Sequence, residues 1–222
     1  APEYKAVVEA SRATHLGPLE LLIKAGAIDS PYQFHWKRFL LENFPKGTGF
    51  PAIAAPAIDE AGLPLSSAQA FSIDDSATTE IDDALSVQGL GSGTITLGIH
   101  IAAPGLAIQP GDAVDHLGRA RLSTVYMPGY KVTMLPDALV QTYTLQAGRD
   151  CPALSLYLTL DEASLEIKAH ESRVERVTIA HNLRHDQLDS VVTVDWLLDP
   201  SFKHENEPEP LPALREQLSF LY

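Results

Sequence analysis

The sequence predicts an α+β fold in which a small N-terminal helical module, of the helix-turn-helix or winged-helix kind, precedes a domain of mixed α/β structure. Three observations lead to this prediction. Residues 1–48 contain short segments with helix-start and helix-stop residues, residues 49–67 are rich in Gly, Pro and Ala, and apolar residues alternate in several later segments. A chain of 222 residues has room for one domain and a smaller one. We expect a helical domain at 1–48, a linker at 49–67 and a mixed domain at 68–222.

The helical module is expected to contain three short helices. The first runs from Glu3 to Ala13, and the second from Pro18 to Ala25, where Gly26 is typical of a helix end. Ser30 is a good N-cap for a third helix that continues to Phe44, before Pro45. This arrangement suggests a helix-turn-helix or winged-helix module.

The mixed domain is expected to contain several strands. Thr94 to Ala102 alternates, with an isoleucine and leucine stripe on the core face and His100 on the opposite face. A glycine-rich connection at 89–93 suits a hairpin to the preceding strand. Residues 154–160 form another alternating strand, and 165–178 follow a turn. His181 and His185 are at helical spacing and are expected on a polar helix face, and an apolar stripe predicts a last helix over Leu211, Leu214, Leu218 and Leu221.

The segment from Phe71 to Val87 concentrates carboxylates, and it contains no Lys or Arg. Its acidic residues are Asp74, Asp75, Glu80, Asp82 and Asp83. Clustered carboxylates repel one another, and a divalent cation is an economical way to neutralise them. Oxygen ligands favour Mg²⁺ or Mn²⁺ over Zn²⁺. The residues alone leave open an acidic loop satisfied by its own backbone amides, whereas a calcium loop of the EF-hand type would need a central glycine that is missing here.

This segment resembles the acidic motif of the ribonuclease II / ribonuclease R (RNB) family of exoribonucleases. In that motif an isoleucine is followed by an aspartate. Further acids stand six, eight and nine residues after this aspartate, and an alanine comes next. Asp74, Asp82 and Asp83 match the family's aspartates, and Glu80 stands where most members have aspartate, as in cyanobacterial, plastid and mitochondrial relatives. The resemblance continues for about a hundred residues, through the segments 99–102, 111–126, 125–129 and 134–136.

The resemblance implies Mg²⁺-dependent hydrolysis of single-stranded RNA from its 3′ end to nucleoside 5′-monophosphates by a two-metal mechanism. It makes Asp82 and Asp83 catalytic residues. It assigns RNA binding to Tyr126, as a stacking residue, and to Arg121. Separately from the resemblance, the place of His100 opposite the core stripe makes it a candidate to support the metal ligands, and the alternative is an ordinary hydrogen-bonded strand histidine. Under this resemblance the metal ligands are Asp74, Glu80, Asp82 and Asp83.

Composition bounds the setting of this activity. The hydrophobic content is 45% and no apolar run is long enough for a membrane span, so we expect no membrane partner. The single cysteine, Cys151, fits a reducing compartment, and we expect the bacterial cytoplasm or, alternatively, an organelle. A monomer is favoured. The formal net charge of −13 argues against tight RNA binding by this chain alone. The resemblance implies that RNA is normally held by separate OB-fold domains, which we do not expect within these 222 residues.

Several features support a runner-up function. Glu80 and Ala103 differ from the commonest family pattern, and the family's later arginine-rich motif has no match. Either the catalytic domain at 68–222 is incomplete, or the resemblance to the family ends after its first half. The alternative is an RNA-binding or scaffold protein with an RNB-like fold and an impaired catalytic site. A third reading is an unrelated Mg²⁺-dependent phosphohydrolase.

Overall fold

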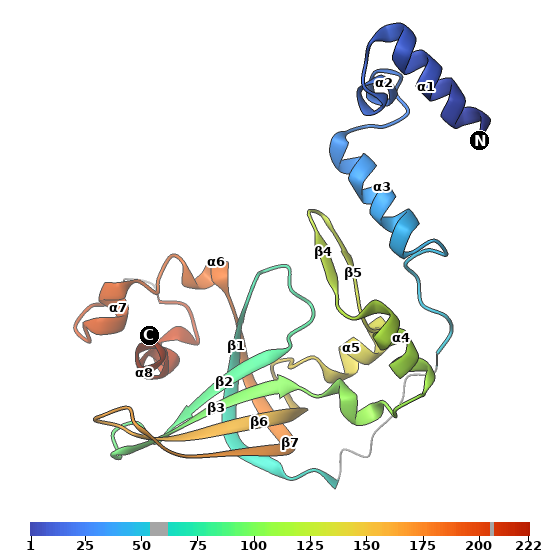
Figure 1. Cartoon of the computed structure of the whole chain (residues 1–222). Helices are drawn as coiled ribbons and strands as arrows, with labels where there is room; N and C mark the ends of the chain where they lie inside the picture. The colour runs from blue at the N-terminus through green and yellow to red at the C-terminus, as the bar shows by residue number, and fades with distance from the viewer. Residues whose placement is uncertain (54–61, 205–206) are drawn as a thin grey trace. The chain divides into compact units, whose positions relative to one another are not determined.

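The chain forms two compact units, residues 1–52 and 53–222, which are described separately. The computed structural model describes residues 1–53, 62–204 and 207–222 (Figure 1). The predicted linker at 49–67 lies partly outside these residues. Within the described part, the first strand begins at Leu65, so the last residues of the predicted linker belong to the second unit.

The first unit is helical, as predicted, and consists of α1 (Pro2–Thr14), α2 (Pro18–Lys24) and α3 (Pro31–Asn43). Each helix has a proline in its first turn, where the missing N–H has no intrahelical acceptor. Ser30 caps α3 because its hydroxyl accepts a hydrogen bond from the Gln33 N–H. Gly26 follows α2 with a φ of 69°, a backbone conformation that glycine adopts without strain. Trp36 is buried in this unit.

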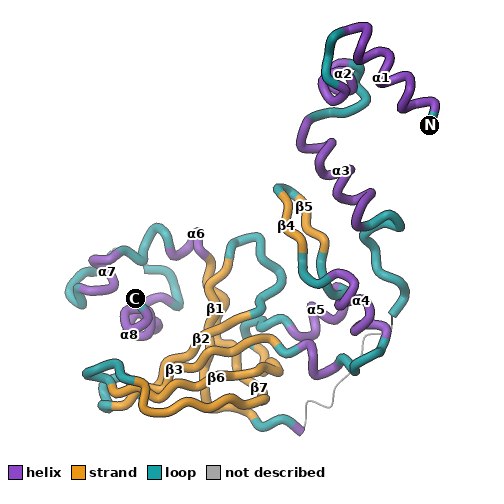
Figure 2. The backbone as a smooth tube through the Cα atoms, in the orientation of Figure 1, coloured by secondary structure: helices purple, strands orange, loops and turns teal. Residues whose placement is uncertain are grey.

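The second unit is built on a closed five-stranded barrel in the order β1-β2-β3-β6-β7 (Figures 1 and 2). Neighbouring strands are antiparallel except for β7 and β1, which pair in parallel and close the barrel. Closure leaves no free sheet edge along the barrel. The strands are β1 (Leu65–Asp74), β2 (Asp83–Gln88), β3 (Thr94–Ala102), β6 (Arg149–Asp161) and β7 (Ile167–Arg184).

Shorter elements lie around the barrel. They are the 3₁₀ helix η2 (Pro104–Ala107), α4 (Ala113–Arg121), β4 (Val125–Met127), β5 (Tyr130–Val132), α5 (Asp137–Tyr143), α6 (His185–Leu188), α7 (Val194–Leu198) and α8 (Leu211–Leu221). β4 and β5 form a separate hairpin. The predicted apolar stripe of the last helix is confirmed, since Leu211, Leu214 and Leu218 are buried against Trp196 and Phe71. None of the described helices is long and apolar enough to cross a membrane.

Two expectations for the strands are corrected. The alternation in β3 is confirmed, but the polar face points into the barrel: His100 is fully buried, whereas Ile101 on the apolar face is 44% exposed. Ile95 at the other end of that apolar face is covered, because Phe220 and Leu221 of α8 pack there. The helix expected around His181 is wrong, because that residue belongs to β7.

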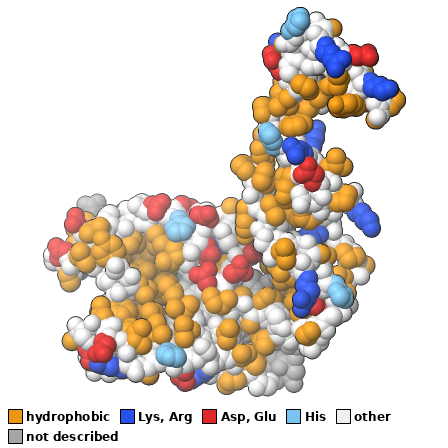
Figure 3. Space-filling model, in the orientation of Figure 1, with side chains coloured by type: hydrophobic (Ala, Val, Ile, Leu, Met, Phe, Trp, Pro, Cys, Tyr) orange, Lys and Arg blue, Asp and Glu red, His pale blue; other side chains and the backbone are white. Residues whose placement is uncertain are grey.

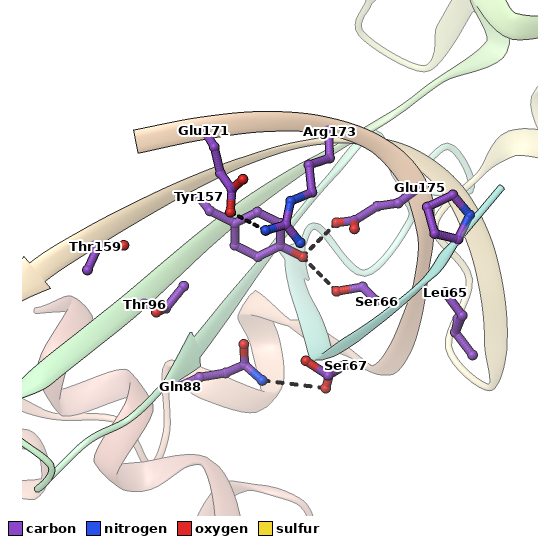
Figure 4. A pocket seen from close by; sticks show the side chains of 11 residues that line it. Leu65, Ser66, Ser67, Gln88, Thr96, Tyr157, Thr159, Glu171, Arg173 and Glu175 are labelled. Carbon is purple, nitrogen blue, oxygen red and sulfur yellow. Dashed lines mark hydrogen bonds and ion pairs between the residues drawn. The ribbon is translucent and has the colours of Figure 1, made fainter. Parts of the chain in front are cut away.

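The barrel interior contains a hydrogen-bonded polar core. His100 Nε2 lies 2.9 Å from Ser86 Oγ, and His100 Nδ1 lies 2.8 Å from Ser155 Oγ. At one barrel end the Tyr157 hydroxyl donates to Glu175 Oε1 at 2.6 Å, beside a polar cavity of about 490 Å³ (Figure 4). Each of these buried polar groups has a partner, which makes the interior compatible with a stable fold.

Gly98→Ala is expected to destabilise this polar core. A Cβ at Gly98 would lie 2.4 Å from Ser86 Oγ and 2.7 Å from His100 Nε2, so the hydrogen-bonded pair would have to move apart. Overpacking of this kind costs about 1–3 kcal/mol, which urea unfolding followed by circular dichroism measures. Gly105→Ala is the control, because a Cβ there meets no atom within 4 Å. Equal stability of the two variants would contradict the prediction.

Candidate metal-dependent active site

The acidic residues lie where β1 ends and β2 begins. Asp74 is the last residue of β1, Asp83 is the first of β2, and Glu80 and Asp82 lie in the loop between them. Acidic side chains gather near the middle of the face shown in Figure 3. Burial raises the pKa of the Asp82 carboxyl above its usual value. Neighbouring negative charges raise this pKa further, in decreasing order Glu80, Asp83 and Asp74.

The loop is held by contacts from distant parts of the chain. The Arg184 guanidinium donates to the backbone carbonyls of Asp75 (3.0 Å) and Thr78 (3.2 Å). The Ile81 N–H donates to Thr144 Oγ1 at 2.8 Å, and the Ile81 side chain is buried. These contacts fix both halves of the loop, so the carboxylates are carried on a braced backbone and not on a free surface loop.

Asn182 positions Asp74 through Ser72. Its Nδ2 donates to Ser72 Oγ (2.9 Å) and to the Leu145 carbonyl (2.9 Å), and Ser72 Oγ donates to Asp74 Oδ2 at 2.6 Å. Asn182 Oδ1 accepts from the Ala147 N–H at 2.7 Å. The sequence analysis missed Asn182 and Arg184. Their role depends on the parallel pairing of β7 with β1, which places Arg184 opposite Asp74 and Asn182 opposite Ser72.

Asn182→Ala is expected to lower the free energy of unfolding by about 1–2 kcal/mol, because backbone groups lose partners that water only partly replaces. It is also expected to loosen Asp74 and so to weaken cation binding. Urea unfolding and calorimetric titration with Mn²⁺ check the two effects. Asn43→Ala is the control, since that amide donates to the Phe39 carbonyl at 3.0 Å in a solvent-exposed hydrogen bond of the helical unit. Unchanged stability and unchanged Mn²⁺ affinity would disprove the positioning role.

The β4–β5 hairpin brings Tyr126 to the acidic loop. Lys131 on β5 donates to Glu80 Oε1 at 2.9 Å, and Tyr126 is directly opposite Lys131 in the β4–β5 register. A groove of about 510 Å³ is lined by the loop and by Tyr126, Tyr130 and Lys131. Tyr126 is 68% exposed, so its ring is accessible for stacking.

Two other candidate residues are engaged elsewhere. The Arg121 guanidinium donates to the Thr133 carbonyl at 2.7 Å, and burial lowers its pKa. This contact ties α4 to the chain just after β5, so its assignment to RNA binding stays a prediction. Both ring nitrogens of His100 bond serines inside the barrel, and its support of the metal ligands likewise stays a prediction.

The donor set fits a divalent cation in its chemistry. Asp74, Glu80, Asp82 and Asp83 offer only oxygen ligands, and the other three carboxylates each raise the pKa of Asp82. In the described part of the chain, however, no three His, Cys, Asp or Glu side chains are arranged to hold a metal ion. One of the four acids, Glu80, is turned to Lys131.

Comparison with known proteins identifies the class. The RNB domain model matches residues 63–209, and the chain therefore belongs to the RNB family. The sequence-based resemblance is confirmed. The matched region begins just before β1 and contains the acidic loop, the β4–β5 hairpin and the whole barrel.

Individual relatives are much longer than this chain. An uncharacterized ribonuclease of Synechocystis sp. is 32% identical over 162 residues, which cover 72% of this chain and 23% of the relative. The structure of yeast Ssd1, a pseudonuclease, has a TM-score of 0.55 at 26% identity over 68% of this chain and 18% of that one. The structure of Mycoplasma genitalium RNase R in complex with ribose methylated single-stranded RNA has a TM-score of 0.58 at 19% identity. The match covers 82% of this chain and 27% of that one, and it is evidence of a shared fold and of nothing more. The chain thus spans about a quarter or less of their lengths.

Proposed function

We propose that this chain is the metal-binding part of an Mg²⁺-dependent exoribonuclease that degrades single-stranded RNA from its 3′ end to nucleoside 5′-monophosphates, with Mn²⁺ as a possible substitute. The main observation behind this proposal is the loop that holds four acids and is fixed by hydrogen bonds from distant residues. The loop lies beside a groove that the exposed Tyr126 also lines. The four acids are Asp74, Glu80, Asp82 and Asp83. Membership in the RNB family supports nuclease chemistry. The lone buried Cys151 supports a reducing compartment, such as the bacterial cytoplasm or an organelle.

The carboxylates would hold the cation, which supplies activation of the attacking water and stabilisation of the departing 3′-oxygen. Asp82 and Asp83 are the proposed catalytic pair. Ser72 holds one oxygen of Asp74 and thereby limits the rotation of that ligand. Tyr126 offers a ring face to a base near the scissile bond, and stacking of this kind is independent of sequence.

The test uses the full-length protein and single-stranded RNA labelled at either end, in Mg²⁺ and in EDTA. With a 5′ label we expect a ladder that shortens from the 3′ end, and with a 3′ label we expect immediate release of a labelled mononucleotide. EDTA is expected to abolish both. RNA that is retained but not shortened in either Mg²⁺ or Mn²⁺ would contradict the proposal.

A second candidate is an RNA-binding or scaffold protein with an impaired catalytic site. Two observations favour it: the described side chains form no ready metal cluster, and yeast Ssd1, a pseudonuclease, is a structural relative. The same assay separates the candidates, since this function predicts RNA retention on a filter without any shortening.

A further inference from the structure

One ion pair joins the acidic loop to the β4–β5 hairpin. Lys131 Nζ lies 2.9 Å from Glu80 Oε1, and the two side chains are 36% and 11% exposed. The ordinary helix-surface pair of Lys24 and Glu20 is 60% and 56% exposed. The Lys131–Glu80 pair is thus better shielded from water, which strengthens its attraction. It is also a long-range contact and therefore depends on where the hairpin lies.

Lys131 both pairs with a carboxylate and lines an open groove. Lys131 and Tyr126 are directly opposite each other in the β4–β5 register, so their side chains share one face of the hairpin. Both also line the groove of about 510 Å³, together with Glu80. A short movement of the flexible lysine stem is enough to turn the ammonium from Glu80 to a ligand in the groove.

We propose that Lys131 is a positioning residue that exchanges partners during substrate binding. It holds the Glu80 carboxylate until a divalent cation takes that oxygen, and it then donates to a phosphate of RNA in the groove. This inference rests on the proposed function, because Glu80 acts as a metal ligand only there. The physical basis is competition, since an ammonium and a divalent cation cannot both occupy the same position at Oε1.

The exchange couples two binding events. Because the cation and the RNA phosphate each draw Lys131 away from its pairing with Glu80, each ligand is expected to favour the binding of the other. Removal of the lysine charge therefore has opposite effects: cation binding becomes tighter and RNA binding becomes weaker. A lysine that merely braced the hairpin would instead weaken both when removed.

The first test measures Mn²⁺ binding to the full chain by isothermal titration calorimetry, without RNA. We expect Lys131→Met to bind Mn²⁺ about two- to fivefold more tightly, as loss of a partly exposed competing pair predicts. Lys131→Arg keeps the pair and is expected to match the wild type. Lys168→Met is the charge-matched control. Lys168 pairs with Glu166 at the beginning of β7, whereas Arg184, which contacts the acidic loop, is at the end of that strand. If circular dichroism shows that Lys131→Met does not fold, Lys131→Gln replaces it.

Equal or weaker Mn²⁺ binding by Lys131→Met, or a gain as large in Lys168→Met, overturns the inference while the proposed nuclease function stands. A wild-type chain that binds no Mn²⁺ overturns both. The two failures are thus distinguishable without an activity assay.

The second test measures the affinity for a phosphorothioate oligo(A) by fluorescence anisotropy at several salt concentrations in Mn²⁺. Loss of one phosphate contact is expected to reduce the slope of log K against log salt by about 0.7 in Lys131→Met. Lys168→Met is expected to keep the wild-type slope. An unchanged slope in Lys131→Met overturns the phosphate contact.

Discussion

Asp82→Asn is expected to reduce RNA hydrolysis by at least about 100-fold in the full-length protein, because a cation bridging the scissile phosphate supplies several kcal/mol of transition-state stabilisation. The pKa of the Asp82 carboxyl is raised by the negative charges of Glu80, Asp83 and Asp74. Asparagine keeps the size of the side chain but removes the charge. The initial rate of shortening of a 5′-labelled RNA at saturating Mg²⁺ measures the effect.

Asp75→Asn is the matched control for this variant. Asp75 lies in the same loop and is exposed, and its backbone carbonyl, not its side chain, receives the Arg184 hydrogen bond. We expect its rate to remain within a few-fold of the wild type. Equal rates for Asp82→Asn and the wild type would remove Asp82 from the catalytic groups, and an equal loss in both variants would indicate a general effect of charge.

The second large effect concerns stability at mildly acidic pH. Burial lowers the pKa of His100 from 6.5 to about 4, although the Glu175 carboxylate opposes this shift. Below pH 6.5 His100 is protonated in the unfolded chain but stays neutral in the folded barrel. The free energy of unfolding therefore falls as the pH drops from about 6.5 towards 4. A pKa difference of this size between the unfolded and folded states lowers the free energy of unfolding by about 3 kcal/mol between neutral pH and pH 4.

The free energy of unfolding in urea, measured from pH 7 to pH 4.5, checks this expectation. His100→Gln retains hydrogen-bonding capacity without a titrating ring, so its stability is expected to fall less steeply over this range. His170→Gln is the control, because His170 is exposed on β7. Parallel pH profiles for His100→Gln and the wild type would show that His100 does not couple folding to protonation.

Local patterns accounted for much of the fold. The helix ends at Gly26 and Ser30 follow from backbone conformation and capping, which are properties of a few adjacent residues. The strand over Thr94–Ala102 and the glycine hairpin that joins it to the preceding strand were also predicted correctly. The sequence analysis did not predict correctly which face of β3 points into the barrel. Alternation defines two faces of a strand, but it does not specify the side on which the barrel closes.

The sequence by itself determined the family and the acids, because the spacing of Asp74, Glu80, Asp82 and Asp83 is a property of one short segment. The tertiary structure alone decided their surroundings. Asn182 and Arg184 reach the loop only because β7 pairs with β1, and Lys131 reaches Glu80 only because the hairpin lies beside it. Such contacts join residues far apart in the chain, and no local pattern specifies them.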